Sequence, residues 1–96
     1  MNSKENEILL ITQEECAEVT KAISKCYRFG LDNVKPGKPK TNRQHLAEEL
    51  GDLQAMIDLC VISGLISKDE LNTASNNKIA KLKVWSDIFK EEANET

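Results

Sequence analysis

The stretch that decides the fold is residues 46–53, LAEELGDL. The apolar side chains in and after it recur at the spacing of one helix face. They are Leu46, Leu50, Leu53, Ile57 and Cys60. Glu49 falls inside this apolar face, and Asp52 follows three residues later, so we expect their Cβ atoms to lie about 5–6 Å apart on one helix surface. The stretch therefore predicts a helix that carries carboxylates among its core-facing side chains.

A second acidic pair with the same spacing lies upstream, where residues 14–18 read EECAE. Glu15 and Glu18 are again three residues apart, on a helix whose apolar face has its own set of side chains. They are Ile8, Ile11, Val19, Ala22 and Cys26. Four carboxylates that face a core need compensation, because an unpaired buried charge is very costly. A hard divalent cation is the simplest compensation, so Glu15, Glu18, Glu49 and Asp52 predict a metal site between two helices.

Composition narrows the class of protein. The 96 residues make one small domain, residues 1–96, and the formal charge of −3 does not favour binding to a nucleic acid polymer. No apolar run approaches the length of a membrane span, and the polar start MNSKENE lacks the apolar stretch of a signal peptide. Three cysteines without CxxC spacing indicate neither a disulfide framework nor a zinc site. These features predict a reduced, cytoplasmic protein.

The sequence pattern predicts three helices and no strands. The first is expected over residues 4–28, ending before Gly30, and Thr12 with Glu15 leaves a break within it open. The continuous apolar face favours one unbroken helix. The second is expected from a capping box at Thr41 as far as Gly64, and the third from a capping box at Ser67 to about residue 92. All-α is therefore the predicted fold class.

Together the two acidic motifs resemble a known family. EExxE at residues 14–18 and ExxD at residues 49–52 are similar to the all-α nucleoside triphosphate pyrophosphohydrolases of the MazG type, most closely their short, phage-type members. The resemblance covers roughly residues 8–86. It implies that a nucleoside triphosphate, with a deoxynucleotide favoured, is hydrolysed between its α and β phosphates. It also implies that Glu15, Glu18, Glu49 and Asp52 bind Mg²⁺, or Mn²⁺ in its place, and serve in catalysis.

The resemblance further implies a set of phosphate contacts on the last core helix. The matching positions here are Asn77, Lys78 and Lys81. Lysines that extend from a helix edge into solvent are the alternative reading of this stretch. A second group of cations surrounds the first loop, and either closes over the phosphates or is simply solvated: Arg28, Lys35, Lys38, Lys40 and Arg43.

Polar and aromatic side chains near these motifs leave further choices open. Asn42 and His45 precede Glu49 on a similar azimuth, where they either touch the nucleotide or only mark the polar start of a helix. Tyr27, Phe29 and Trp85 either stack on a base or pack in a core or interface.

The sequence leaves alternatives open for both the assembly and the function. The resemblance implies a homo-oligomeric helical bundle, with a tetramer built from two dimers favoured. Alternative functions are a non-catalytic helical oligomer that binds nucleotide or a protein partner, and the related phosphoribosyl-ATP pyrophosphohydrolase. A di-iron carboxylate bundle needs Glu-x-x-His on facing helices, and the single histidine, His45, does not supply it.

Overall fold

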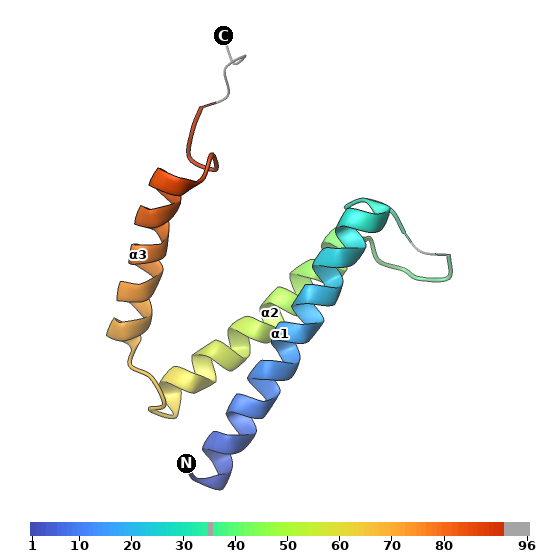
Figure 1. Ribbon diagram of the computed structural model, residues 1–96. Helices are drawn as coiled ribbons and strands as arrows, with labels where there is room; N and C mark the ends of the chain where they lie inside the picture. The colour runs from blue at the N-terminus through green and yellow to red at the C-terminus, as the bar shows by residue number, and fades with distance from the viewer. Residues whose placement is uncertain (35, 92–96) are drawn as a thin grey trace. The chain divides into compact units, whose positions relative to one another are not determined.

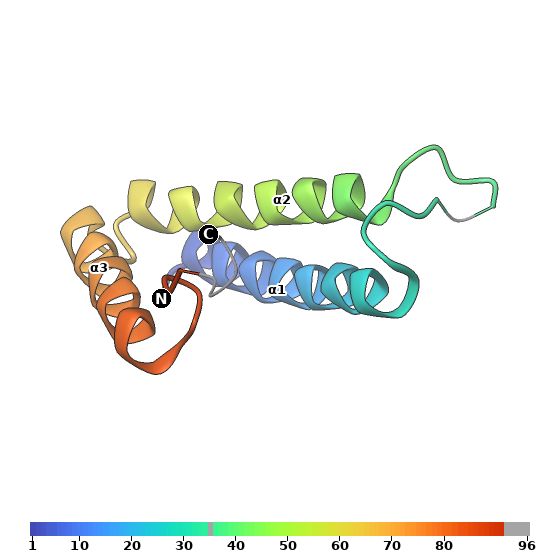
Figure 2. The same ribbon diagram turned by 90° about the horizontal axis from the view of Figure 1, so that it is seen from above.

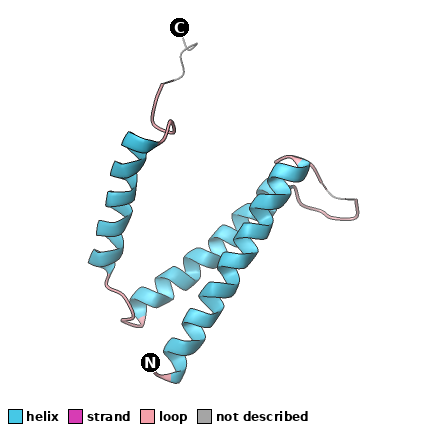
Figure 3. Ribbon diagram, viewed as in Figure 1, coloured by secondary structure: helices cyan, strands magenta, loops and turns pink. Residues whose placement is uncertain are grey.

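The computed structural model describes residues 1–34 and 36–91, which form three α-helices (Figure 1). They are α1 (Ser3–Phe29), α2 (Asn42–Ile62) and α3 (Lys68–Trp85). Within the described residues the β-type pairing is an isolated antiparallel bridge between Val34 and Thr41, and Figure 3 shows helices and loops without strands. The all-α prediction is confirmed.

Each helix begins with a capping box, in which the N-cap side chain and the third helical residue bond reciprocally to each other's backbone N–H. The three pairs are Asn2 with Glu5, Thr41 with Gln44, and Ser67 with Glu70. The second and third were predicted, whereas α1 begins slightly earlier than expected. Thr12 does not cap a break, because its hydroxyl donates to the Ile8 carbonyl oxygen at 2.7 Å. α1 is therefore one continuous helix.

The helix ends agree with the sequence at α1 and differ at α3. Gly30 ends α1 with φ of +90°, and its N–H donates to the Cys26 carbonyl oxygen at 2.9 Å. α3 stops at Trp85, so the predicted helix beyond it is wrong for residues 86–91, and residue 92 lies outside the described residues. Ser86 has extended backbone angles, and its hydroxyl accepts from the Ile88 N–H at 3.1 Å. Such side chain to backbone bonding competes with helix continuation.

α1 and α2 lie side by side and run antiparallel, joined by the loop of residues 30–41 (Figures 1 and 2). Residues 1–65 form one compact unit, and a second unit, which contains α3, begins at Ile66. The core of the first unit is small: Ile8, Val19, Ala22, Met56 and Cys60 are its buried side chains. This helical hairpin holds all four predicted metal-binding acids.

Much apolar surface stays exposed within the single chain. α3 has no buried residue, and Trp85 at its end is 84% exposed. Ile62 and Val84 are 78% and 69% exposed. Exposed apolar surface of this extent normally marks an interface. None of the described helices combines the length and apolar character needed to cross a membrane.

Candidate metal centre

Three of the four predicted metal ligands come together. Glu15 projects from α1, and Glu49 and Asp52 project from α2. Each residue offers a carboxylate oxygen, and these three atoms all lie within 4.8 Å of one another. The hairpin thus brings side chains more than thirty positions apart in the chain into one cluster. An all-oxygen donor set of this charge suits a hard divalent cation such as Mg²⁺ or Mn²⁺.

The cluster is less enclosed than its helical azimuths predicted. Within the described residues no charged side chain is fully buried. Glu15 is half-buried, the Glu49 side chain is 14% exposed, and Asp52 is exposed. The expectation of carboxylates buried in a core is therefore wrong for the single chain. The physical reason is that two helices shield only the seam between them, and Asp52 lies toward the outside of that seam.

Glu18 does not join the three clustered acids. Its Oε1 accepts a hydrogen bond from the Lys21 ammonium at 3.4 Å, and its side chain is 46% exposed. It still lies close enough to Glu15 to add to the negative potential there. Its role as a metal ligand stays a prediction.

Glu15 shows the electrostatic consequence of the clustering. Its pKa is raised above the ordinary value of 4.5, first by desolvation and then by the charges of neighbouring acids. Those acids are, in order of effect, Asp52, Glu49, Glu18 and Glu14. Desolvation and like charges both disfavour the ionised carboxylate. A bound cation would relieve the repulsive part of this penalty, so the electrostatics also fit a metal.

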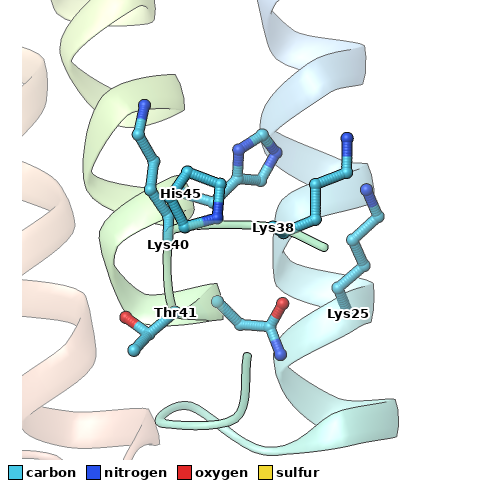
Figure 4. A pocket seen from close by; sticks show the side chains of 7 residues that line it. Lys25, Lys38, Lys40, Thr41 and His45 are labelled. Carbon is cyan, nitrogen blue, oxygen red and sulfur yellow. The ribbon is translucent and has the colours of Figure 1, made fainter. Parts of the chain in front are cut away.

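His45 links this cluster to a cavity. Its Nε2 lies 3.8 Å from Oε1 of Glu49, one helical turn away. It also lines a cavity of about 390 Å³ formed by the end of α1, the loop and the start of α2 (Figure 4). The other polar side chains on this cavity are Lys25, Lys38, Lys40, Thr41 and Asn42. The structure therefore places His45 and Asn42, whose roles the sequence left open, on the same cavity, and it places His45 next to Glu49.

The loop cations have different environments. The Arg43 guanidinium bonds both carboxylate oxygens of Asp32, at 3.0 and 3.2 Å, and this contact lowers the pKa of Asp32 and raises the pKa of Arg43. Lys40 pairs with Glu48. The Arg28 guanidinium carbon lies 4.9 Å from the centroid of the Phe29 ring. Lys35, named with these cations, lies outside the described residues. Three of the cations thus already have partners.

Lys25 was missed by the sequence analysis. It belongs to the last two turns of α1, where nothing in the local sequence distinguishes it from other exposed helix lysines. The fold of the loop, which brings Lys38 back toward α1, makes it a cavity residue. A non-local contact of this kind leaves no periodic signal in the sequence.

The loop is anchored on the first turn of α2. The N–H of Asn42 donates to the Asn33 carbonyl oxygen at 3.2 Å, and the N–H of Arg43 donates to the Leu31 carbonyl oxygen at 2.8 Å. The Asn42 side-chain amide donates to the Gly30 carbonyl oxygen at 2.8 Å. These bonds tie the start of the loop to the first turn of α2, from which Asn42 lines the cavity.

The aromatic candidates occupy different settings. Phe29 lines a second cavity of about 370 Å³ together with Asn33, Val34 and Pro36. The two cavities share Lys25 and Asn42 as lining residues. Tyr27 and Trp85 are 88% and 84% exposed. Trp85 does not pack in a core within the single chain, so interface packing and base stacking stay open for it.

The predicted phosphate-binding residues Asn77, Lys78 and Lys81 all lie on α3, in the second unit. All three are exposed, although by helical azimuth Lys78 falls within the apolar face of this helix and Lys81 lies at its edge. Their contact with phosphate stays a prediction.

The sequence of this hairpin and of α3 matches a known family. Residues 3–82 match the family described as the MazG nucleotide pyrophosphohydrolase domain. The chain belongs to the MazG family. The match includes both acidic motifs and extends into α3, and it confirms the resemblance found in the sequence. MazG proteins are nucleotide pyrophosphohydrolases that generally use a divalent metal, in agreement with the cluster of Glu15, Glu49 and Asp52. No curated protein and no solved structure gave a significant match.

Proposed function

We propose that the protein is a Mg²⁺-dependent hydrolase of a nucleoside triphosphate, with a deoxynucleotide as the preferred class. Cleavage between the α and β phosphates yields the monophosphate and pyrophosphate. The observation that supports this proposal most is the approach of three carboxylates to within 4.8 Å in a chain of the MazG family.

The acidic residues of the hairpin would hold the ion. Glu15, Glu49 and Asp52 supply oxygen ligands from both helices, and Glu18 is the fourth proposed ligand. A bound Mg²⁺, or Mn²⁺ in its place, neutralises charge on phosphate oxygens and lowers the pKa of water. The carboxylates would hold the ion, and one of them would accept the proton of the attacking water as a general base.

Cationic and amide side chains would hold the substrate's phosphates. We propose Asn77, Lys78 and Lys81 for this role because they match the family's phosphate-binding stretch and are exposed on α3. Charge-assisted hydrogen bonds from ammonium groups are the strong contacts available to phosphate oxygens. These residues belong to the second unit of the chain, separate from the hairpin that carries the acids.

The active form is proposed to be a homo-oligomer, with a tetramer built from two dimers favoured. The small core and the exposed apolar side chains of α2 and α3 support this assembly. Packing against a second copy would cover Ile62, Val84 and Trp85, which the single chain leaves exposed.

Release of pyrophosphate tests the proposed function directly. The full chain is incubated with each common ribo- and deoxynucleoside triphosphate, and with phosphoribosyl-ATP, in the presence of Mg²⁺ or of a chelator. We expect Mg²⁺-dependent release from at least one deoxynucleotide and none after Glu49→Gln. Asp58→Asn is the matched control, because Asp58 is an exposed acid of the same helix whose Oδ1 accepts from Gln54 at 3.0 Å.

The outcomes separate the alternatives. Release from phosphoribosyl-ATP alone would identify the related histidine-synthesis activity instead. Nucleotide binding without release from any substrate would support the non-catalytic alternative and overturn the proposal. Near-normal release by Glu49→Gln would show that the carboxylate cluster is not the reaction centre.

A further inference from the structure

We propose that the cavity beside the acidic cluster binds the two terminal phosphates of the nucleotide, the part released as pyrophosphate. The ammonium groups of Lys25 and Lys38 and the imidazole of His45 are the proposed contacts. This inference rests on the proposed function, and it assigns the leaving pyrophosphate to a place in the hairpin.

The cavity concentrates positive charge that has no partner. Among the described residues, Lys25 and Lys38 form no ion pair with a carboxylate, whereas Lys40 on the same cavity pairs with Glu48. Two ammonium groups without a carboxylate partner therefore line the same cavity. Such a site favours an anion with charges at two adjacent points.

The cavity lies beside the acidic cluster, where a polyphosphate needs nearby positive charge. His45 lies on the cavity, and its Nε2 is 3.8 Å from the Glu49 carboxylate, so an anion held here lies next to the acidic cluster. The carboxylates alone would repel the phosphate chain. In Figure 4 the ammonium ends of Lys25 and Lys38 extend toward the same end of the cavity as His45. They are therefore placed to offset that repulsion.

The backbone of α2 cannot serve as the anion site in their place. The N–H groups of Asn42 and Arg43 are bonded to loop carbonyl oxygens, and that of Gln44 is bonded to the Thr41 hydroxyl oxygen at 3.1 Å. The free donors that helix N-termini usually offer to phosphates are thus already used. Recognition of an anion here depends on side chains, which makes it open to mutation.

The size and charge of the cavity fit a pyrophosphate group. A volume of about 390 Å³ lies within the range of small-molecule sites. The two adjoining phosphates of pyrophosphate can engage both lysines at once. Orthophosphate would engage them only in part, so we expect it to bind much more weakly.

Calorimetric titration of the full chain with inorganic pyrophosphate tests this assignment. The titrations are made at low ionic strength with a chelator present, so that metal at the acidic cluster does not contribute. We expect Lys25→Met and Lys38→Met each to weaken binding about tenfold or more, the usual loss for one charged hydrogen bond. Lys4→Met is the matched control, because it removes the same charge from an exposed position in the first turn of α1. Lys25→Arg keeps the charge and should retain most of the affinity.

Hydrolysis by the parent protein, measured in parallel, separates the two proposals. Lysine-dependent binding of pyrophosphate without any hydrolysis would support this site and overturn the proposed function. Hydrolysis by the parent, with Lys25→Met and Lys38→Met binding pyrophosphate as tightly as Lys4→Met, would overturn this site alone. Failure of the parent to bind pyrophosphate, or equal binding of orthophosphate, would also overturn it.

Discussion

Replacing Glu49 by Gln should change the stability of the protein in opposite directions with and without Mg²⁺. Glu49 and Asp52 have carboxylate oxygens within 4.8 Å of each other, and two unit charges at that distance in water repel by about 0.9 kcal/mol. Like-charged pairs on exposed helices cost about 0.2–0.5 kcal/mol. Since about 1 kcal/mol moves the Tm of a domain this size by about 4–8 °C, the metal-free variant should melt about 1–7 °C above the parent.

Saturating Mg²⁺ should reverse this order. An ion at about a hundred times its Kd stabilises the folded state by about 2.7 kcal/mol, which corresponds to about 11–22 °C. This gain is larger than the relief of repulsion, so the parent should melt above the variant once the ion is bound. Removing one of three clustered carboxylates should abolish most of the gain.

Thermal melting followed by circular dichroism, at equal protein concentrations, measures both effects. Asp58→Asn removes a charge from the same helix away from the cluster, so its response to Mg²⁺ should match that of the parent. If Mg²⁺ raises the Tm of Glu49→Gln as much as that of the parent, Glu49 is not a ligand. A lower Tm of the variant in chelator would refute the repulsion argument.

Three other outcomes are expected. Lys78→Met should slow hydrolysis about ten- to a hundredfold, since a charged hydrogen bond to phosphate contributes about 1.5–3 kcal/mol. Unchanged kinetics would show that Lys78 is solvated and does not contact phosphate. In metal-free protein the Tm should rise as the pH falls from 7 toward 4.5, because the pKa of Glu15 is raised, and should fall below pH 3.8, because the pKa of Asp32 is lowered. Asp32→Asn should reduce the fall in Tm below pH 3.8, measured in a series of thermal melts at different pH. Trp85 is the single tryptophan and is 84% exposed in one chain. Its fluorescence emission should shift to the blue as the protein concentration rises and light scattering reports assembly. A monomer at every protein concentration would exclude the oligomer.

Local sequence signals predicted the helices well. The capping boxes at Thr41 and Ser67 and the helix end at Gly30 are each formed by contacts within a few residues, so the local sequence was enough to predict them. The end of α3 was not predicted correctly, because just beyond the helix the hydroxyl of Ser86 accepts a hydrogen bond from the backbone N–H of Ile88. Such a contact competes closely with one more helical turn.

The candidate site was predictable in part for the same reason. Glu49 and Asp52 follow from helical spacing alone, and Glu15 from the matching motif on α1. The degree of burial was overestimated, because azimuth shows which side of a helix is apolar but not how much of it a neighbour covers. Lys25 and Lys38 meet only through the fold of the loop, which spacing does not encode.

The bonds between the loop and α2 also divide the loop into a fixed base and a tip. Asn33 and Leu31 are bonded to the first turn of α2, and the Val34–Thr41 bridge closes the base. Insertions or deletions beyond that bridge need not move either helix, since loop closure costs little per added residue. A change in tip length would reshape the wall that carries Lys38 and leave Glu15 and Glu49 in register. On the proposed assignment of the cavity and the acidic cluster, a change in loop length alone would alter ligand preference and leave the metal-binding acids unchanged.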